Sequence, residues 1–153
     1  MSKPEVAVVM GSKSDLPVME RTCKMLEHFG IAYTTSILSA HRNPNKTRDF
    51  ARAAARHGFK VIIAGAGMAA HLPGAIASET TLPVIGVPLA GSPLSGMDAL
   101  HSMVQMPSGV PVATLAIGEA GATNAAILAA QILALQKPAL RKKLRAYKRR
   151  LAG

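Results

Sequence analysis

Short apolar runs alternate along the chain with longer segments in which apolar residues recur every three or four positions. The runs predict five strands, at residues 5–10, 31–38, 60–64, 83–87 and 111–117. The longer segments predict helices at residues 16–29, 44–57, 96–106 and 122–136, a short helix between the third and fourth strands, and a last helix after Pro138. Gly30 and Gly58 follow two of these helices, as is usual at helix carboxyl ends.

Strands separated by helices are typical of βαβ units with right-handed crossovers. The pattern therefore predicts an α/β fold: a three-layer αβα sandwich around a doubly wound, parallel, five-stranded sheet of flavodoxin-like character. The 153 residues suit one domain, and only 3% of them are aromatic, so aliphatic side chains must form the core. We expect residues 1–136 to form the main domain and residues 137–153 a basic helix of the same domain.

The charge of the chain is concentrated at its carboxyl end. The formal net charge is +10, and eight of the eighteen Lys and Arg residues lie between Lys137 and Arg150. Tyr147 is the only aromatic residue of that segment, whereas nucleic-acid binding usually combines basic and stacking side chains. We interpret the segment as a solvated terminal helix and do not expect nucleic acid as a partner.

The predicted helix at 122–136 is apolar on almost every side, which a surface helix of a small monomer does not tolerate. We expect the core of a homo-oligomer to cover it, because the apolar stretch 125–135 is interrupted by Gln131 and too short for a bilayer. Cys23 is the only cysteine, so a disulfide within one chain is excluded. With no signal-peptide pattern at the amino end, we predict a cytoplasmic protein.

Candidate chemistry lies in the loops that follow the strands, where open parallel sheets bind ligands. In the loop Gly11–Asp15, Ser12, Ser14 and the small backbone suit an anion at a helix amino end, and Asp15 suits ribose hydroxyls. The alternative, that Ser14 or Asp15 only caps the helix, is about equally supported. The loop is not a Walker A or GxGxxG motif.

Two further loops carry histidines. The segment SAHRNP places Ser39, His41 and Arg42 together, which suits phosphate or carboxylate binding beside a proton-transfer group; alternatively His41 is merely solvated. The segment GAGMAAHLPG offers a backbone-rich wall and His71, which alternatively only bonds a neighbouring carbonyl. No spacing typical of metal ligands is present, so we predict no metal site.

These loops, in this order, resemble the bacterial N5-carboxyaminoimidazole ribonucleotide mutases of purine biosynthesis. The matching segments are VVMGSKSD, SAHRNP, VIIAGAGMAAHLPG, PVIGVP, LSGMDALHSMVQMPSGVPVATLAIG and GATNAAILAAQIL. They span about residues 7–135 and leave out the basic tail. Asn43 stands where the family usually has Thr, and Met68 where it usually has a small residue.

The resemblance implies a cofactor-free isomerase, assembled as a homo-octamer, that moves a carboxylate from the exocyclic nitrogen of an aminoimidazole ribonucleotide to ring carbon C4. It makes His41 the catalytic residue and His71 a second histidine of the site. The substrate contacts expected are Ser12, Ser14, Asp15, Ser39, Ala40, Arg42, Gly67, Met68, Ala69 and Leu72. The alternatives are direct carboxylation of the aminoimidazole with carbon dioxide and a non-catalytic flavin or nucleotide module. The second lacks the aromatic stacking residues usual near flavin.

Overall fold

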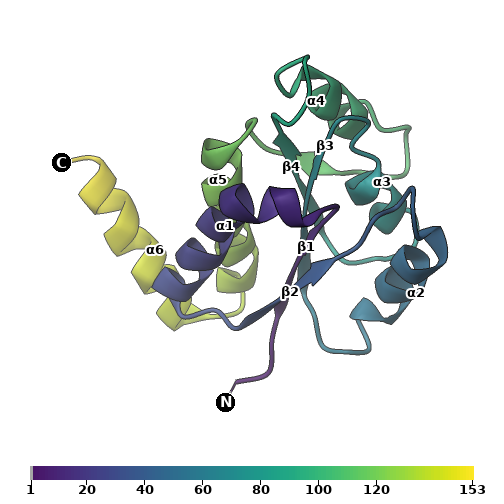
Figure 1. Ribbon diagram of the computed structural model, residues 1–153. Coiled ribbons are helices and arrows are strands. Elements are labelled where there is room, and N and C mark those ends of the chain that lie inside the picture. Colours follow the sequence, from purple (N-terminus) through teal and green to yellow (C-terminus); the bar gives the residue numbers. More distant parts are fainter. Residues whose placement is uncertain (1) are drawn as a thin grey trace.

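The computed structural model describes residues 2–153 and contains a parallel sheet between two layers of helices (Figure 1). The strands are β1 (Val6–Met10), β2 (Tyr33–Ile37), β3 (Val61–Gly67), β4 (Val84–Leu89) and β5 (Ala113–Thr114), in the spatial order β2-β1-β3-β4-β5. The helices are η1 (Lys13–Asp15), α1 (Leu16–Phe29), α2 (Pro44–Ala54), α3 (Leu72–Ala77), α4 (Met97–Val104), α5 (Glu119–Ala134) and α6 (Pro138–Leu151). All strand pairs are parallel, which confirms the predicted flavodoxin-like sandwich.

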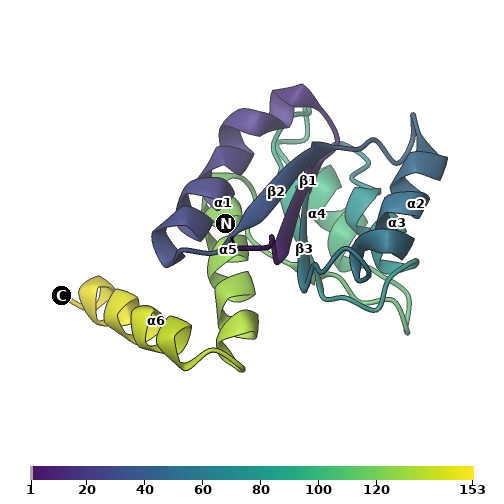
Figure 2. The same cartoon turned by 90° about the horizontal axis from the view of Figure 1, so that it is seen from below.

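Alternation along the strands produces the two layers. In β1, Val6, Val8 and Met10 face the core that is shared with α1 and α5, whereas Ala7 and Val9 face the core on the side of α2, α3 and α4. All five side chains of β1 are buried, as expected for a central strand covered on both faces. Figures 1 and 2 show α1 and α5 on one side of the sheet and α2, α3 and α4 on the other.

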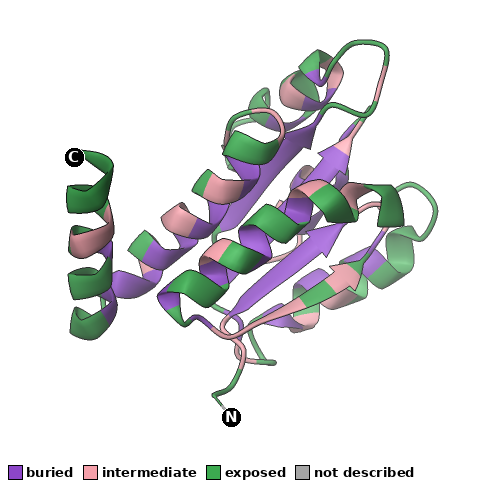
Figure 3. Cartoon of the chain, turned by 60° about the vertical axis from the view of Figure 1, so that its left-hand side comes forward, coloured by how far each residue is buried: buried purple, intermediate pink, exposed green. Residues whose placement is uncertain are grey.

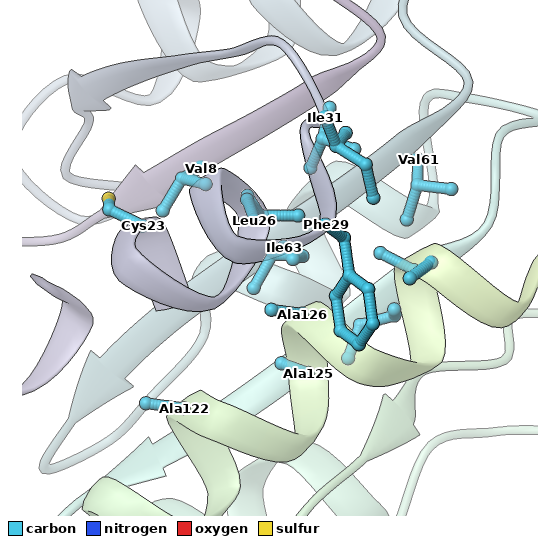
Figure 4. Packing of buried hydrophobic residues seen from close by; sticks show 14 of the residues in the cluster. Val8, Cys23, Leu26, Phe29, Ile31, Val61, Ile63, Ala122, Ala125 and Ala126 are labelled. Atoms are coloured by element: carbon cyan, nitrogen blue, oxygen red, sulfur yellow. The ribbon is translucent and has the colours of Figure 1, made fainter. Parts of the chain in front are cut away.

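Small residues let α1 and α5 pack closely. Ala122, Ala125 and Ala126 of α5 are fully buried against α1 and the sheet (Figure 4). Thr22 of α1 is buried as well, and its hydroxyl donates to the carbonyl oxygen of Ala122 at 2.7 Å. This bond satisfies a polar group that α1 places inside the contact.

The amphipathic helix α6 packs its apolar side on the end of α1 and α5, and its charged side faces outward (Figure 3). Leu140 and Leu144 are buried in the same cluster as Phe29 and Leu133. Part of the surface of α5 for which the sequence predicts cover by another subunit is therefore covered by the chain itself. Among residues 2–153, no helix is both long and apolar enough to cross a membrane.

The structure corrects several predicted boundaries. β3 continues through Gly65–Gly67, a segment that the sequence pattern assigns to a loop, because these residues pair with Val87–Leu89 of β4. β5 is much shorter than the predicted strand 111–117, since it is an edge strand that pairs only with β4. Helix α2 ends at Ala54, three residues before the predicted end, and α5 begins at Glu119, three residues before the predicted start.

Candidate active site

The carboxyl ends of β1, β2, β3 and β4 surround a pocket of about 400 Å³, which we call the strand-end pocket. All twelve residues predicted for the site line it: Ser12, Ser14, Asp15, Ser39, Ala40, His41, Arg42, Gly67, Met68, Ala69, His71 and Leu72. Four more line it that the sequence analysis does not select: Gly11, Ala66, Ala70 and Gly91. Gly11, Ala66 and Ala70 belong to loops that the sequence analysis names, and none of the four has a functional side-chain group that would single it out.

The loop after β1 is held by its own polar side chains. Asp15 accepts a hydrogen bond from the backbone N–H of Ser12 at 2.9 Å, and the Ser12 hydroxyl accepts from the N–H of Ser14 at 3.3 Å. Ser12 and Asp15 thus form a capping box at the start of η1. Asp15 is also the N-cap residue of α1, but its side chain makes no capping bond to that helix, so the predicted alternative of α1 capping by Ser14 or Asp15 is not seen. Capping occupies one carboxylate oxygen of Asp15 and leaves the group lining the pocket.

Asp15 is the only carboxylate among the described residues that line the strand-end pocket. Burial raises the pKa of its carboxyl group, and the N–H groups of Ser12 and Gly11 oppose that change. An acceptor confined in this way suits the hydroxyl groups of a sugar better than a phosphate.

The loop after β2 presents His41 and Arg42 to the pocket as exposed side chains. The Ser39 hydroxyl accepts the N–H of Arg42 at 3.1 Å, and the Asn43 side chain caps α2 by accepting the N–H of Lys46 at 3.2 Å. Asn43 therefore performs the capping that a Thr would perform at this position.

The loop after β3 brings the second histidine to the first. His71 is the N-cap residue of α3, but its side chain makes no capping bond. The ring centroids of His41 and His71 lie 5.2 Å apart, with an interplanar angle of 38°. Although the two residues are thirty positions apart in the chain, the structure pairs them at one wall of the pocket.

Met68 adopts a left-handed backbone conformation, with φ of 55°, at the turn between β3 and His71. Such a conformation is uncommon for a residue other than glycine and is frequent at functional sites. Its side chain is 62% exposed and lines the pocket. Met68 thus places a long thioether at the pocket, where the family usually has a small side chain.

A second recess of about 410 Å³ adjoins the strand-end pocket and shares Gly11, Ser12, Ser39 and Arg42 with it. We call it the cationic recess, because Lys13, Arg42 and Lys46 line it and, among residues 2–153, no acidic side chain does. Three positive charges beside small backbone-rich loops suit a phosphate group. By contrast, the described residues contain no group of three His, Cys, Asp or Glu side chains arranged to hold a metal ion.

A known family and its members match this chain over most of its length. Residues 5–153 match the model of the family described as AIR carboxylase. The N5-carboxyaminoimidazole ribonucleotide mutase of Vibrio cholerae is 54% identical over 143 residues, which cover 94% of this chain and 89% of that protein. The phosphoribosylaminoimidazole carboxylase of Candida glabrata is 58% identical over 133 residues, which cover 87% of this chain and 23% of that protein.

Solved structures agree as well. The crystal structure of PurE from Treponema denticola superposes with a TM-score of 0.87 at 28% identity, covering 97% of this chain and 92% of that one. Fold, length and sequence all match over almost the whole chain. The chain belongs to the AIR carboxylase family.

Proposed function

We propose that this protein converts N5-carboxyaminoimidazole ribonucleotide to 4-carboxy-5-aminoimidazole ribonucleotide. The relatives named as mutases match it over 94% or more of the chain, which supports this isomerase activity in purine biosynthesis. The observation that carries the proposal is the pairing of His41 and His71 beside an anion-binding loop in one pocket.

The substrate is held by its anionic and hydroxyl groups. Its phosphate lies against Ser12, Ser39 and Arg42, where the strand-end pocket meets the cationic recess. Asp15 accepts a ribose hydroxyl, and Ser14 adds a hydroxyl donor. The imidazole ring then extends toward the two histidines, along the wall formed by Ala40, Gly67, Ala69 and Leu72.

In the proposed chemistry, His41 gives up one proton and takes up another, so it ends the cycle in the protonation state in which it began. His41, protonated, gives a proton to the exocyclic nitrogen as the nitrogen–carbon bond of the carbamate breaks and carbon dioxide leaves. The electron-rich ring then attacks carbon dioxide through C4. Neutral His41 removes the C4 proton, which restores the aromatic ring and the imidazolium, so neither a metal nor a cofactor is needed.

The small residues of the pocket wall hold the released carbon dioxide. Gly67, Ala69 and Ala70 leave room for a small apolar molecule beside the ring and offer no nucleophile to trap it. Retention in such a space gives a large effective concentration of carbon dioxide and favours its addition to C4 over its escape.

Assays with two different substrates distinguish a mutase from a direct carboxylase. Direct carboxylation is the activity that the name of the Candida relative suggests. We expect metal-free protein to convert N5-carboxyaminoimidazole ribonucleotide rapidly, monitored by ultraviolet absorbance, and to convert aminoimidazole ribonucleotide with modest bicarbonate slowly. Efficient turnover of the second mixture would instead establish direct carboxylation. Removing the proton-transfer group with His41→Gln is expected to lower kcat by about 10²–10⁴-fold, and normal turnover of that variant would refute the role of His41.

We further propose a cytoplasmic homo-oligomer, an octamer by resemblance, with residues 1–136 as the catalytic domain and 137–153 as its appended helix. Ile127, Leu128 and Ile132 of α5 remain only partly buried in the single chain, which supports a subunit contact there. Light scattering coupled to size exclusion measures the mass directly, and a monomer would refute the assembly.

A further inference from the structure

The two histidines of the site lie on different structural units. His41 belongs to the turn that leads into α2, and His71 is the residue from which α3 begins. The ring separation of 5.2 Å therefore depends on how α2 and α3 are held relative to each other. These two helices pack side by side on the same face of the sheet, as Figures 1 and 2 show.

One carboxylate joins the two helices. Glu79 lies just after the end of α3 and accepts from the Nε of Arg52 at 2.7 Å through one oxygen. Its other oxygen lies 3.2 Å from the Nε of Arg48. Arg48 and Arg52 are four positions apart and thus on one face of α2, so a single carboxylate binds two successive turns of that helix.

The cluster lies directly behind the histidine wall. Arg48 and Glu79 line a side cavity of about 200 Å³ whose remaining wall includes Ala40 and His71. Ala40 and His71 also line the strand-end pocket, so the two spaces share that wall. The Glu79 side chain is 23% exposed, and the guanidinium of Arg52 and then that of Arg48 hold the pKa of its carboxyl below the usual range, so it stays ionised at neutral pH.

We propose that Glu79 is a positioning residue for catalysis, which joins α2 to α3 through Arg48 and Arg52 and thereby sets the distance between His41 and His71. The inference rests on the proposed proton transfer by His41. A single exposed ion pair contributes little, but a carboxylate shared by two arginines forms a network with fixed geometry. Without the negative charge of Glu79, the guanidinium groups of Arg48 and Arg52 repel each other on one face of α2 with no anion between them.

The consequence concerns the rate more than the binding of substrate. Of the proposed phosphate and ribose contacts, Ser12 and Asp15 lie on the loop after β1, outside the ion pairs of Glu79, whereas Ser39 and Arg42 lie beside His41 and move together with it. A shift of the histidines relative to the ring, however, costs rate steeply, by up to about 10²-fold per ångström. Loss of the carboxylate should therefore lower kcat and leave KM almost unchanged.

The chain contains a matched control. Glu5 is 24% exposed and pairs with Lys137 at the amino end of β1, the edge of the sheet opposite the strand-end pocket. Glu79→Gln and Glu5→Gln thus remove the same charge from carboxylates of nearly equal exposure. We expect Glu79→Gln to lower kcat about tenfold with KM within twofold of the unaltered protein, and Glu5→Gln to change neither.

Two further measurements keep the outcome decisive. With Arg48 and Arg52 both changed to Gln, adding Glu79→Gln should lower kcat no further, because the network is already gone. If circular dichroism shows that Glu79→Gln does not fold, the Arg48→Gln variant tests the positioning role instead. We expect it to lower kcat at unchanged KM. Full kcat in the folded variant refutes the positioning role, as does an equal loss in Glu5→Gln, whereas an inactive unaltered protein refutes the proposed function instead.

Discussion

Gly121 lies in the first turns of α5, where the helix passes closest to the segment that follows β5. A Cβ atom built on Gly121 would lie 1.6 Å from the carbonyl oxygen of Ala116 and 2.7 Å from its carbonyl carbon. Both atoms belong to the backbone and cannot rotate away. We predict that Gly121→Ala severely destabilises the protein, although the same substitution inside a helix normally stabilises it.

Two opposing contributions decide the size of the effect. Alanine favours a helix interior over glycine by about 1 kcal/mol. Against this, α5 and Ala116 must separate by about 1.4 Å to reach 3.0 Å, the shortest distance that real Cβ contacts show. Because Ala122, Ala125 and Ala126 are fully buried, that movement opens the contact with α1, and overpacking of this kind costs about 3 kcal/mol or more. The expected net loss is at least about 2 kcal/mol.

Urea unfolding followed by circular dichroism, at one protein concentration, measures this difference. With a urea dependence of about 2 kcal/mol per molar, the midpoint should fall by about 1 M. Gly74→Ala is the control, because Gly74 also lies inside a helix but its added Cβ would meet only the flexible end of Met106, at 3.0 Å. We expect no loss of stability in that variant. Equal midpoints for Gly121→Ala and the unaltered protein would show that the backbone clash does not govern this contact.

Two other variants test the site and the terminal helix. Because burial raises the pKa of Asp15, the folded state holds more protons than the unfolded state between the unfolded and folded pKa values, and stability falls as pH rises through that window. Asp15→Asn should therefore raise Tm at neutral pH but not below the unfolded pKa, while weakening substrate binding; a Tm difference independent of pH would contradict this. Leu144→Ala should cost about 2 kcal/mol, because Leu144 of α6 is buried in the cluster that contains Phe29 and Leu133. Leu151→Ala, at an exposed position of the same helix, should change the free energy of unfolding by less than about 0.5 kcal/mol, and neither variant should change kcat. Equal stability of these two variants would show that α6 does not contribute to the core.

Local patterns in the sequence are enough to predict the central elements. β1 and α1 agree with their predicted bounds to within one residue, because a fully apolar run and a clear helical period are each decided by neighbouring residues. The glycines of β3 are misassigned for the same reason: Gly65 and Gly67 by themselves are typical of a loop, and only pairing with β4 makes them part of a strand.

The candidate site is predictable to a similar depth. Loops rich in Gly, Ser and His after successive strands must meet at one edge of a parallel sheet, so the order of the residues suffices to select these loops, and the family resemblance adds the twelve individual residues, all of which line the pocket. Their mutual distances do not follow from that order, because strand order, register and helix packing set them.

Periodicity and turn chemistry are local, and they specify which elements form and which side chains gather at the carboxyl edge of the sheet. The 5.2 Å spacing of His41 and His71, the shared carboxylate of Glu79 and the cover that α6 gives to α5 arise only in the folded chain. Each of these contacts joins residues far apart in the sequence. Their geometry follows from how whole helices pack on the sheet, a property that no short segment of sequence contains.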